Sequence, residues 1–385
     1  MTRRLLVLSL FANLAFSGCS YWGQTVGSEG RLHTKDRSKR ESLTRRWSSK
    51  SLKLNEDLTL TVVNFIDKSH GWIGGYEGTV YSTDDGGRTW QTAKLPTGPN
   101  SYVSGISFSG SAIGWVAVRR DPPEVMDRKG YKSIVLRTDN AGRSWQEQRA
   151  WNGTQIYRVR FINNEVGWLV GRKLEDGGLF VMHTTDGGSN WVELSSNVIN
   201  PTNNDFATDI YAIDRSRATL LTVEGKVYST VDGGQRWTQD LTIRDEPEQT
   251  FMAKVGVLGN GTVWVLGSTD SKEGMWTTIV RQFAGDSSKR FRTGDVRIKD
   301  ISFLSEDEIV GCGSMSNSDD ALFGSRTGVV LYSSDAGHSW EKIYSDAESR
   351  TLNAIATVDG NFWIVGDHGL TLYLSASGSS RPGDK

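Results

Sequence analysis

The chain contains few of the residues that would indicate a disulfide scaffold, a metal site or a nucleic-acid partner. Two of its 385 residues are cysteine, so no disulfide framework is expected to support the fold. The five histidines fall on separate parts of the chain without the spacing of metal ligands. A formal net charge of −1 gives no electrostatic reason to expect nucleic acid as a partner. No convincing helix is present to carry a phosphate-binding loop, so we expect no metal and no cofactor.

The apolar run at the start of the chain is too short to remain as a membrane span. It extends from Leu5 to Phe16, follows two arginines and ends in Phe16-Ser17-Gly18-Cys19. This ending is typical of the cleavage box of bacterial lipoproteins. We therefore predict that residues 1–18 are a signal peptide and that Cys19 is lipidated, which would make the protein exported and membrane-anchored. An ordinary secretory signal cut near Gly18, or a twin-arginine signal, is the alternative.

Residues 19–46 are polar, lack periodicity and become basic towards their end. We interpret them as a solvated tether between the lipid anchor and a folded domain at 47–376, because no apolar face accompanies the charge. Contact of the basic residues with a membrane surface or a partner is the alternative. Residues 377–385 are predicted to be a disordered tail.

A short turn motif is repeated through the chain. Its first copy, Ser82 to Trp90, reads STDDGGRTW. The hydroxyl and the carboxylate can accept bonds from the N–H groups of their own turn, while the glycine tolerates positive φ. The acid or amide and the tryptophan of the five copies are Asp85 and Trp90, Asn140 and Trp145, Asp186 and Trp191, Asp232 and Trp237, and Asp335 and Trp340. We expect these acids to stabilise the turns rather than to act as catalysts or metal ligands.

The repeats predict an all-β fold. Strand patterns separated by short turns begin at seven places in the chain, namely Leu60, Val103, Ile156, Ile210, Ala253, Ile298 and Leu352. A period of roughly 40–50 residues with four strands in each unit is typical of β-propeller blades. The sequence therefore predicts a seven-bladed β-propeller with four-stranded antiparallel blades.

The last unit lacks a fourth strand, which indicates how the ring closes. The segment from Trp47 to Leu54 resembles the outer strand of the first unit, in which Trp90 is followed by Lys94-Leu95. We predict that this N-terminal segment is the outer strand of the last blade, because such pairing removes two free sheet edges. Removal of residues up to Leu54 should then destabilise the whole ring.

Across about residues 47 to 375 the chain resembles the photosystem II stability/assembly factor family, which lies within the Asp-box (BNR-like) propellers. The phrases GWIGGYEGTVYSTDDGGRTW and GWLVGRKLEDGGLFVMHTTDGGSNW carry the resemblance. It implies a non-catalytic seven-bladed propeller that faces the periplasm or the thylakoid lumen, often as a lipoprotein. It further implies a scaffold that holds a protein partner, such as a membrane-protein assembly intermediate. We expect the protein to be a monomer.

Binding is predicted on the face opposite the Asp-containing turns, where loop length varies. The loops between second and third strands are long in blade two (Arg119 to Lys132) and blade six (Ser314 to Gly328), and intermediate in blade three (Arg172 to Gly178) and blade five (Ser268 to Trp276). Variable loops on a rigid scaffold are the usual location of binding residues. The residues that we predict to bind the partner are Tyr102, Arg119, Arg120, Arg128, Arg158, Arg172 and Lys254.

The starts of the first strands should surround the mouth of a central channel. Aligned by repeat, the residues at this mouth are Tyr102, Arg158, Asp209, Lys254, Asp300 and Asn353. One hypothesis is that Arg158 and Lys254 bind a carboxylate or an acidic peptide. The alternative is that Asp209 and Asp300 pair with them and leave a neutral centre.

Glycan binding or hydrolysis by a propeller of the cell envelope is the rival function. A sialidase-like site needs an arginine triad and a Tyr–Glu pair, and the nearest segment, Phe291-Arg292-Thr293, lacks the continuation of the family motif. A glycosidase with two carboxylates needs acids facing each other across a cleft, for which Asp209 and Asp300 are the candidates. Acids beside basic residues are more often ion-paired than catalytic, so we expect the protein not to be an enzyme.

Overall fold

The computed structural model describes residues 47–54, 58–98, 100–122, 130–198, 204–243, 250–271, 274–282, 289–293, 296–316, 326–348 and 350–376. Within these ranges the chain forms strands β1 to β28 and one short 3-10 turn, η1 (Ser195–Asn197). No helix in this described part is long and apolar enough to cross a membrane. Two predicted site residues, Cys19 and Arg128, lie outside the described residues, as do the proposed signal, the tether and the tail.

The described strands form seven four-stranded antiparallel sheets, which we number as blades in chain order. Blades 1 and 2 contain β2 (Leu60–Phe65), β3 (Gly71–Gly75), β4 (Thr79–Thr83) and β5 (Gln91–Lys94), then β6 (Ser101–Phe108), β7 (Gly114–Arg120), β8 (Lys132–Thr138) and β9 (Gln146–Asn152). Blades 3 and 4 contain β10 (Thr154–Phe161), β11 (Gly167–Lys173), β12 (Leu179–Thr184) and β13 (Val192–Glu193), then β14 (Ala207–Ala212), β15 (Ala218–Thr222), β16 (Lys226–Thr230) and β17 (Thr238–Thr242). Blades 5 and 6 contain β18 (Thr250–Val257), β19 (Val263–Ser271), β20 (Gly274–Gln282) and β21 (Lys289–Arg292), then β22 (Val296–Phe303), β23 (Ile309–Ser316), β24 (Arg326–Ser333) and β25 (Glu341–Ser345). Blade 7 contains β26 (Leu352–Val358), β27 (Asn361–Gly366), β28 (Leu370–Ala376) and β1 (Trp47–Lys53).

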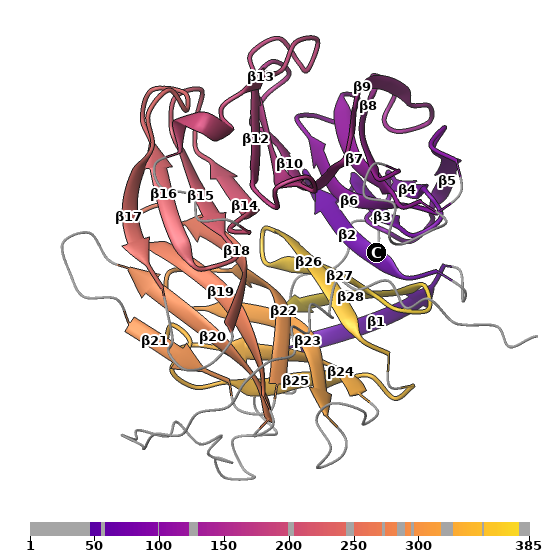
Figure 1. Ribbon diagram of the computed structural model, residues 1–385. Helices are drawn as coiled ribbons and strands as arrows, with labels where there is room; N and C mark the ends of the chain where they lie inside the picture. Colours follow the sequence, from indigo (N-terminus) through magenta and orange to yellow (C-terminus); the bar gives the residue numbers. More distant parts are fainter. Residues whose placement is uncertain are drawn as a thin grey trace, which may run out of the picture.

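The last blade is closed by the first strand of the fold, as predicted. Strand β1 pairs antiparallel with β28 from Trp47↔Ala376 to Lys53↔Leu370, and Figure 1 shows the indigo β1 beside the yellow β28. The Trp47 ring lies 5.5 Å from Tyr332 of blade 6 and 5.6 Å from Phe362 of blade 7. The closing strand is therefore held by backbone pairing and by aromatic packing across a blade junction.

The first strand of each blade contacts neighbouring blades at the centre of the ring, and each of these strands carries a β-bulge at the same position. A bulge leaves one residue unpaired and changes the direction of the side chains around it. The bulged residues are Thr61, Ser104, Tyr157, Thr208, Ala253, Lys299 and Asn353. The residues that follow them are Val62, Gly105, Arg158, Asp209, Lys254, Asp300 and Ala354. This register corrects our alignment of the residues at the channel mouth. Tyr102 lies two residues before the bulge of its strand and Asn353 is itself the bulged residue. The other four predicted residues all directly follow the bulge and therefore occupy equivalent positions.

A recurrent aromatic stack explains why glycine precedes tryptophan in the second strands. The ring of Trp72 in blade 1 stacks on Phe108 of blade 2, with centroids 3.5 Å apart. Phe108 covers Gly114 so closely that an added Cβ would lie 2.4 Å from the ring. The same stack joins Trp115 to Phe161 and Trp363 to Phe65. The glycine is thus required because the phenylalanine occupies the space of a side chain.

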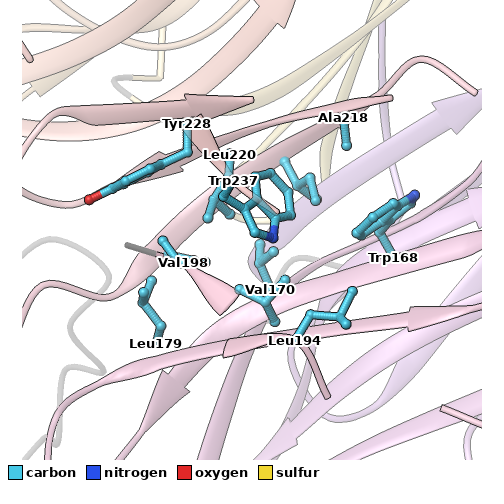
Figure 2. Packing of buried hydrophobic residues seen from close by; sticks show 12 residues of the cluster. Trp168, Val170, Leu179, Leu194, Val198, Ala218, Leu220, Tyr228 and Trp237 are labelled. Carbon is cyan, nitrogen blue, oxygen red and sulfur yellow. The ribbon is translucent and has the colours of Figure 1, made fainter. Parts of the chain in front are cut away.

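The junction between blades 3 and 4 is packed differently. Blade 4 has Ala212 where blades 1 to 3 have phenylalanine. The two positions are equivalent, since Ala212 pairs with Ala218 as Phe108 pairs with Gly114. Trp168 instead stacks on His183 at 4.0 Å and meets the ring of Trp237 edge-on at 6.0 Å. Figure 2 shows Trp168 and Trp237 among the aliphatic residues of this cluster. Both tryptophans are buried, so this junction depends on hydrophobic packing without the repeated stack.

The predicted bounds of the loops need correction, including those in blade 6, where Ser314 to Ser316 pair with Gly328 to Arg326. The segment of blade 5 that we interpreted as an intermediate loop continues its hairpin, with pairs from Thr269↔Trp276 to Ser271↔Gly274. Arg119 and Arg120 belong to β7, and Arg172 belongs to β11, rather than to the loops that follow them. These strands extend because their alternating residues continue to pair beyond the turn signals that we used as boundaries.

Candidate functional site

The five Asp-box turns are held by their own side chains. In blade 1 the Thr83 Oγ1 atom accepts a bond of 2.9 Å from the Gly87 N–H, and Asp85 Oδ1 accepts a bond of 3.0 Å from the Thr89 N–H. Gly87 has a φ of 83°, which a side chain would disfavour. Equivalent bonds end on the hydroxyl and on the acid or amide in every other copy. This geometry agrees with the predicted structural role of Asp85, Asn140, Asp186, Asp232 and Asp335.

The hydrogen bonds also determine the ionisation of the turn acids. Partial burial raises the pKa of the Asp85 carboxyl, but bonds from Thr89, Thr83 and Arg88 outweigh it and bring the pKa to about 2. The tryptophans of the turns pack inward: Trp90 and Trp145 meet Phe65 and Phe108 edge-on. Trp191 does the same in blade 3, Trp237 packs on Trp168, and Trp340 joins the blade 6 core.

At the centre of the ring, four charged side chains of blades 3 to 6 form two ion pairs, which we call the central cluster. Arg158 Nε lies 3.4 Å from Asp209 Oδ1, and Lys254 Nζ lies 2.6 Å from Asp300 Oδ2. These ion pairs are the ones expected from our alternative hypothesis, in which Asp209 and Asp300 neutralise the two basic residues. Desolvation lowers the pKa of Lys254, and Asp300 opposes that shift.

Both acids of the central cluster also bond to the backbone of the next blade. Asp209 Oδ2 accepts a bond of 3.1 Å from the N–H of Val255, and Asp300 Oδ2 accepts a bond of 3.1 Å from the N–H of Ile355. Asp209 is 1% exposed and Asp300 is 6% exposed. Acids that are buried, ion-paired and bonded to the backbone join blades together, and they are poorly placed to exchange protons with a substrate.

Beside the central cluster, alternating aromatic and arginine side chains run across blades 1 to 4 on the face of the predicted binding loops. We call this set the aromatic–arginine row, and its members are Tyr76, Tyr102, Arg119, Tyr157, Arg172 and Phe206. The Tyr76 and Tyr102 rings stack at 5.3 Å. The guanidinium carbon of Arg119 lies 4.4 Å from the centre of the Tyr102 ring and 5.8 Å from that of Tyr157. Cations over aromatic faces are attracted by the ring quadrupole, so the rings fix the position of Arg119.

The second half of the row repeats this arrangement in blades 3 and 4. Tyr157 and Phe206 have ring centroids 5.5 Å apart, and the guanidinium carbon of Arg172 lies 5.1 Å from the Phe206 ring. Tyr157 is the bulged residue of β10, and its carbonyl accepts a bond of 2.9 Å from Arg158 Nη1. The row therefore adjoins the central cluster at consecutive residues.

The row has a positive electrostatic character. Burial raises the pKa of the Tyr157 hydroxyl, and Arg119 and Arg172 act in the opposite direction. The acid closest to Arg119 in the described ion pairs is Asp121 at 3.8 Å, and burial raises the pKa of that carboxyl while Arg119 lowers it. Arg120 is exposed next to Arg119. Tyr102, Arg119, Tyr157 and Phe206 are buried, so Arg120 and the half-buried Arg172 are the arginines here that can meet acidic groups of a peptide.

The structure divides the predicted site residues into two groups. Tyr102, Arg119 and Arg172 lie together in the row, with Arg120 beside them, whereas Arg158 and Lys254 belong to the central cluster. Sequence analysis missed Tyr76, Tyr157 and Phe206. Their signal was weak: each is an aromatic residue near a strand boundary, and only the pairing of neighbouring blades brings the rings together.

No group of three or more histidine, cysteine, aspartate or glutamate side chains in the described ranges is arranged to hold a metal ion. Cys312 is buried in blade 6, and burial raises the pKa of its thiol well above the usual value. A thiol in this state is a poor nucleophile.

A family model described as "Photosynthesis system II assembly factor YCF48" matches residues 39–129 and 128–286. The chain is 24% identical to the photosystem II assembly lipoprotein Ycf48 of Synechococcus sp. (strain CC9902), over 80% of this chain and 82% of that protein. It is 22% identical to the photosystem II stability/assembly factor HCF136 of Arabidopsis thaliana, over 85% of this chain and 78% of that protein.

Solved structures share the fold at lower identity. A structure of YCF48 bound to D1 peptide superposes with a TM-score of 0.60 at 19% identity, covering 85% of this chain and 96% of that one. Virginiamycin B lyase from Staphylococcus aureus superposes with a TM-score of 0.62 at 12% identity, covering 86% of this chain and 99% of that one. The likeness to both an assembly factor and a lyase shows that the architecture by itself does not decide function.

Proposed function

Because the chain belongs to the YCF48 family of photosynthesis system II assembly factors, we propose that it is a non-catalytic assembly factor that binds a segment of a photosystem II protein. The relatives named above support this proposal, and one solved relative is described as bound to D1 peptide. They do not favour the rival glycan-binding or glycan-hydrolysing function.

The observation that carries the proposal is the aromatic–arginine row. Its buried rings hold Arg119 and Arg172 in place, and Arg120, the next residue of β7, is exposed. Arginine offers planar, paired donors for carboxylates, and the half-buried Arg172 and exposed Arg120 can present them. A rigid row of this kind can bind a short segment of a partner without catalytic groups. Arg128, Arg158 and Lys254 remain predicted contacts, Arg128 from the long loop and the other two through the adjoining central cluster.

The test is the binding of a synthetic D1 peptide, measured by fluorescence anisotropy. We expect the double substitution Arg120→Glu, Arg172→Glu to weaken binding at least tenfold, since about 1.4 kcal/mol corresponds to a factor of ten. The matched control is Arg143→Glu, Arg236→Glu, which makes the same charge change in exposed turns of the opposite face. Equal losses in both variants would show that net charge, rather than the row, governs binding, and unchanged binding in the first would refute the proposal.

We further propose that the protein is exported and anchored through a lipid on Cys19, facing the periplasm or the thylakoid lumen as a monomer. The lipoprotein names of relatives support the anchor. Cys19→Ser should move the mature protein from the membrane fraction to the soluble fraction and abolish labelling by a fatty-acid analogue. Retention of the variant in membranes with the label intact would contradict the anchor.

A further inference from the structure

Lys299 occupies the bulged position of β22 at the centre of the ring. It belongs to blade 6, whereas the aromatic–arginine row lies in blades 1 to 4. The residue as a whole is half-buried. Its Nζ donates a bond of 2.7 Å to Oδ1 of Asn353, the bulged residue of the next blade. An amide oxygen is a weak partner for an ammonium group because it carries no compensating charge.

Asn353 cannot turn its other end towards Lys299. Its Nδ2 donates bonds of 2.9 Å to the carbonyl of Leu60 and to Oδ1 of Asp367. These bonds fix the amide with its oxygen facing Lys299. Asp367 is thus bonded to Asn353, and none of the ion pairs between described residues includes Lys299.

The other cations at the centre differ in this respect. Arg158 and Lys254 each have an aspartate, and Asp300 is already used by Lys254 and by the backbone N–H of Ile355. Desolvation lowers the pKa of Lys299 to about 8, a shift that Asp367 opposes and Arg297 reinforces. Cys312 and Arg326 also act on Lys299, whereas Asp300, Arg158 and Asp209 act on Lys254.

We propose that Lys299 is an anion site that binds one small carboxylate at the centre of the ring. The carboxylate would accept charge-assisted bonds from Nζ and supply the charge that Asn353 cannot. A monovalent group is preferred because Asp367, which acts on Lys299, would repel a second negative charge. The ligand is either a free small acid or the terminal carboxylate of a peptide, which present the same group. The site is independent of the function proposed for the row.

The experiment uses chloride as a reporter and carboxylates as competitors. The line width of ³⁵Cl is measured with the full chain at pH 7, and acetate, acetyl-alanine and acetyl-alaninamide are then added. We expect acetate to remove the protein-dependent broadening and acetyl-alaninamide to leave it, because the amide lacks the charge. Competition by acetate with none by acetyl-alanine assigns the site to free small acids, and competition by both extends it to peptide termini. Absence of any protein-dependent broadening would overturn the proposal.

Two substitutions and a pH series test the assignment to Lys299. We expect Lys299→Met to reduce anion affinity at least tenfold without lowering the melting temperature, because it removes a cation that is costly to bury; the surface control Lys68→Met should change neither. Above a pH of about 8, affinity in the native protein should fall about tenfold per pH unit as Lys299 loses its proton. Lys299→Arg should bind with no such fall, since arginine stays charged. Unchanged affinity in Lys299→Met, or a pH profile that is flat in the native protein, would refute the site.

Discussion

The ring is held together in two different ways along its circumference. Three junctions, 7/1, 1/2 and 2/3, have a tryptophan stacked on a phenylalanine of the next blade, with its Nε1 donating to a carbonyl of the Asp-box turn there. We call these junctions the stacked arc. The junctions from 3/4 to 6/7 form the charged arc, in which ion pairs or aspartate bonds at the centre join successive blades.

The two devices are distributed unevenly around the ring. Aromatic packing also occurs in the charged arc, where Trp264 of blade 5 meets Phe303 of blade 6 in a tilted arrangement with centroids 5.2 Å apart. In the stacked arc, the residues equivalent to Arg158 are uncharged, namely Val62, Gly105 and Ala354. The hydrogen bond to the carbonyl of the Asp-box turn also has a different donor in the charged arc. At junction 5/6, Arg281 Nη1 rather than a tryptophan donates to the carbonyl of Ala336, at 3.4 Å. Hydrophobic stacking stabilises in proportion to the buried area, whereas a buried ion pair contributes little net stability but is costly to break. The charged arc should therefore be the more sensitive to single substitutions.

The largest expected effect is on the closing strand, which joins blade 7 at the boundary of the two arcs. A chain that begins after Leu54 loses the whole of β1 and the packing of Trp47 on Tyr332 and Phe362. We expect the free energy of unfolding to fall by at least about 4 kcal/mol, which is typical for the loss of one large aromatic side chain alone. Urea denaturation measures it, with a chain that lacks only residues 1–46 as the control. Equal stability of the two chains would contradict the closure of the ring by β1.

Next in size is the breaking of one ion pair in the charged arc. Asp209→Ala leaves Arg158 and the N–H of Val255 without their partner in a buried position. We expect a loss of about 3–5 kcal/mol. The double variant Arg158→Met, Asp209→Leu should recover part of this loss in urea denaturation, because it removes both charges. A loss below about 1 kcal/mol in Asp209→Ala, the usual value for an exposed pair, would mean that the arcs do not differ in this way.

A smaller effect separates the tryptophans of the two arcs. Trp115→Phe removes the bond of 3.0 Å from Nε1 to the carbonyl of Gly187, so we expect a loss of about 1 kcal/mol beyond the cost of the smaller buried ring. Trp168 is the matched control, because its buried Nε1 has no hydrogen-bond partner in the described structure. Denaturant midpoints should show a smaller loss for Trp168→Phe than for Trp115→Phe. The reverse order would show that the bond is not what distinguishes the stacked arc.

The smallest effect concerns the turn acids. The pKa of Asp85 is lowered from 3.8 to about 2 in the folded protein, so Asp85 stabilises the fold above its unfolded pKa. This contribution is lost as the pH falls from about 4 towards 2. Asp85→Asn should make the free energy of unfolding less dependent on pH in this range, since Asn140 already serves the equivalent turn in blade 2. An unchanged pH slope in the variant would contradict the role of these bonds.

The amino-acid sequence by itself determined the repeat, the four-stranded unit and the closure by the N-terminal strand. These features are visible because each Asp-box turn is stabilised by residues within a few positions of one another, from Thr83 to Trp90 for example, and because strand pairing within a blade joins neighbouring segments. The sequence also selected Arg119 and Arg172 as predicted site residues, because they border variable loops, and Tyr102, because it was aligned with the mouth of the channel.

Only the tertiary structure decided which of these residues meet. The bulge in each first strand sets the register that places Arg158 against Asp209 and leaves Lys299 facing Asn353, and a shift of one residue would turn these side chains elsewhere. The aromatic–arginine row likewise joins side chains from four blades that are distant in the chain. Contacts between blades depend on register and spacing in three dimensions, and no local pattern in the sequence records them.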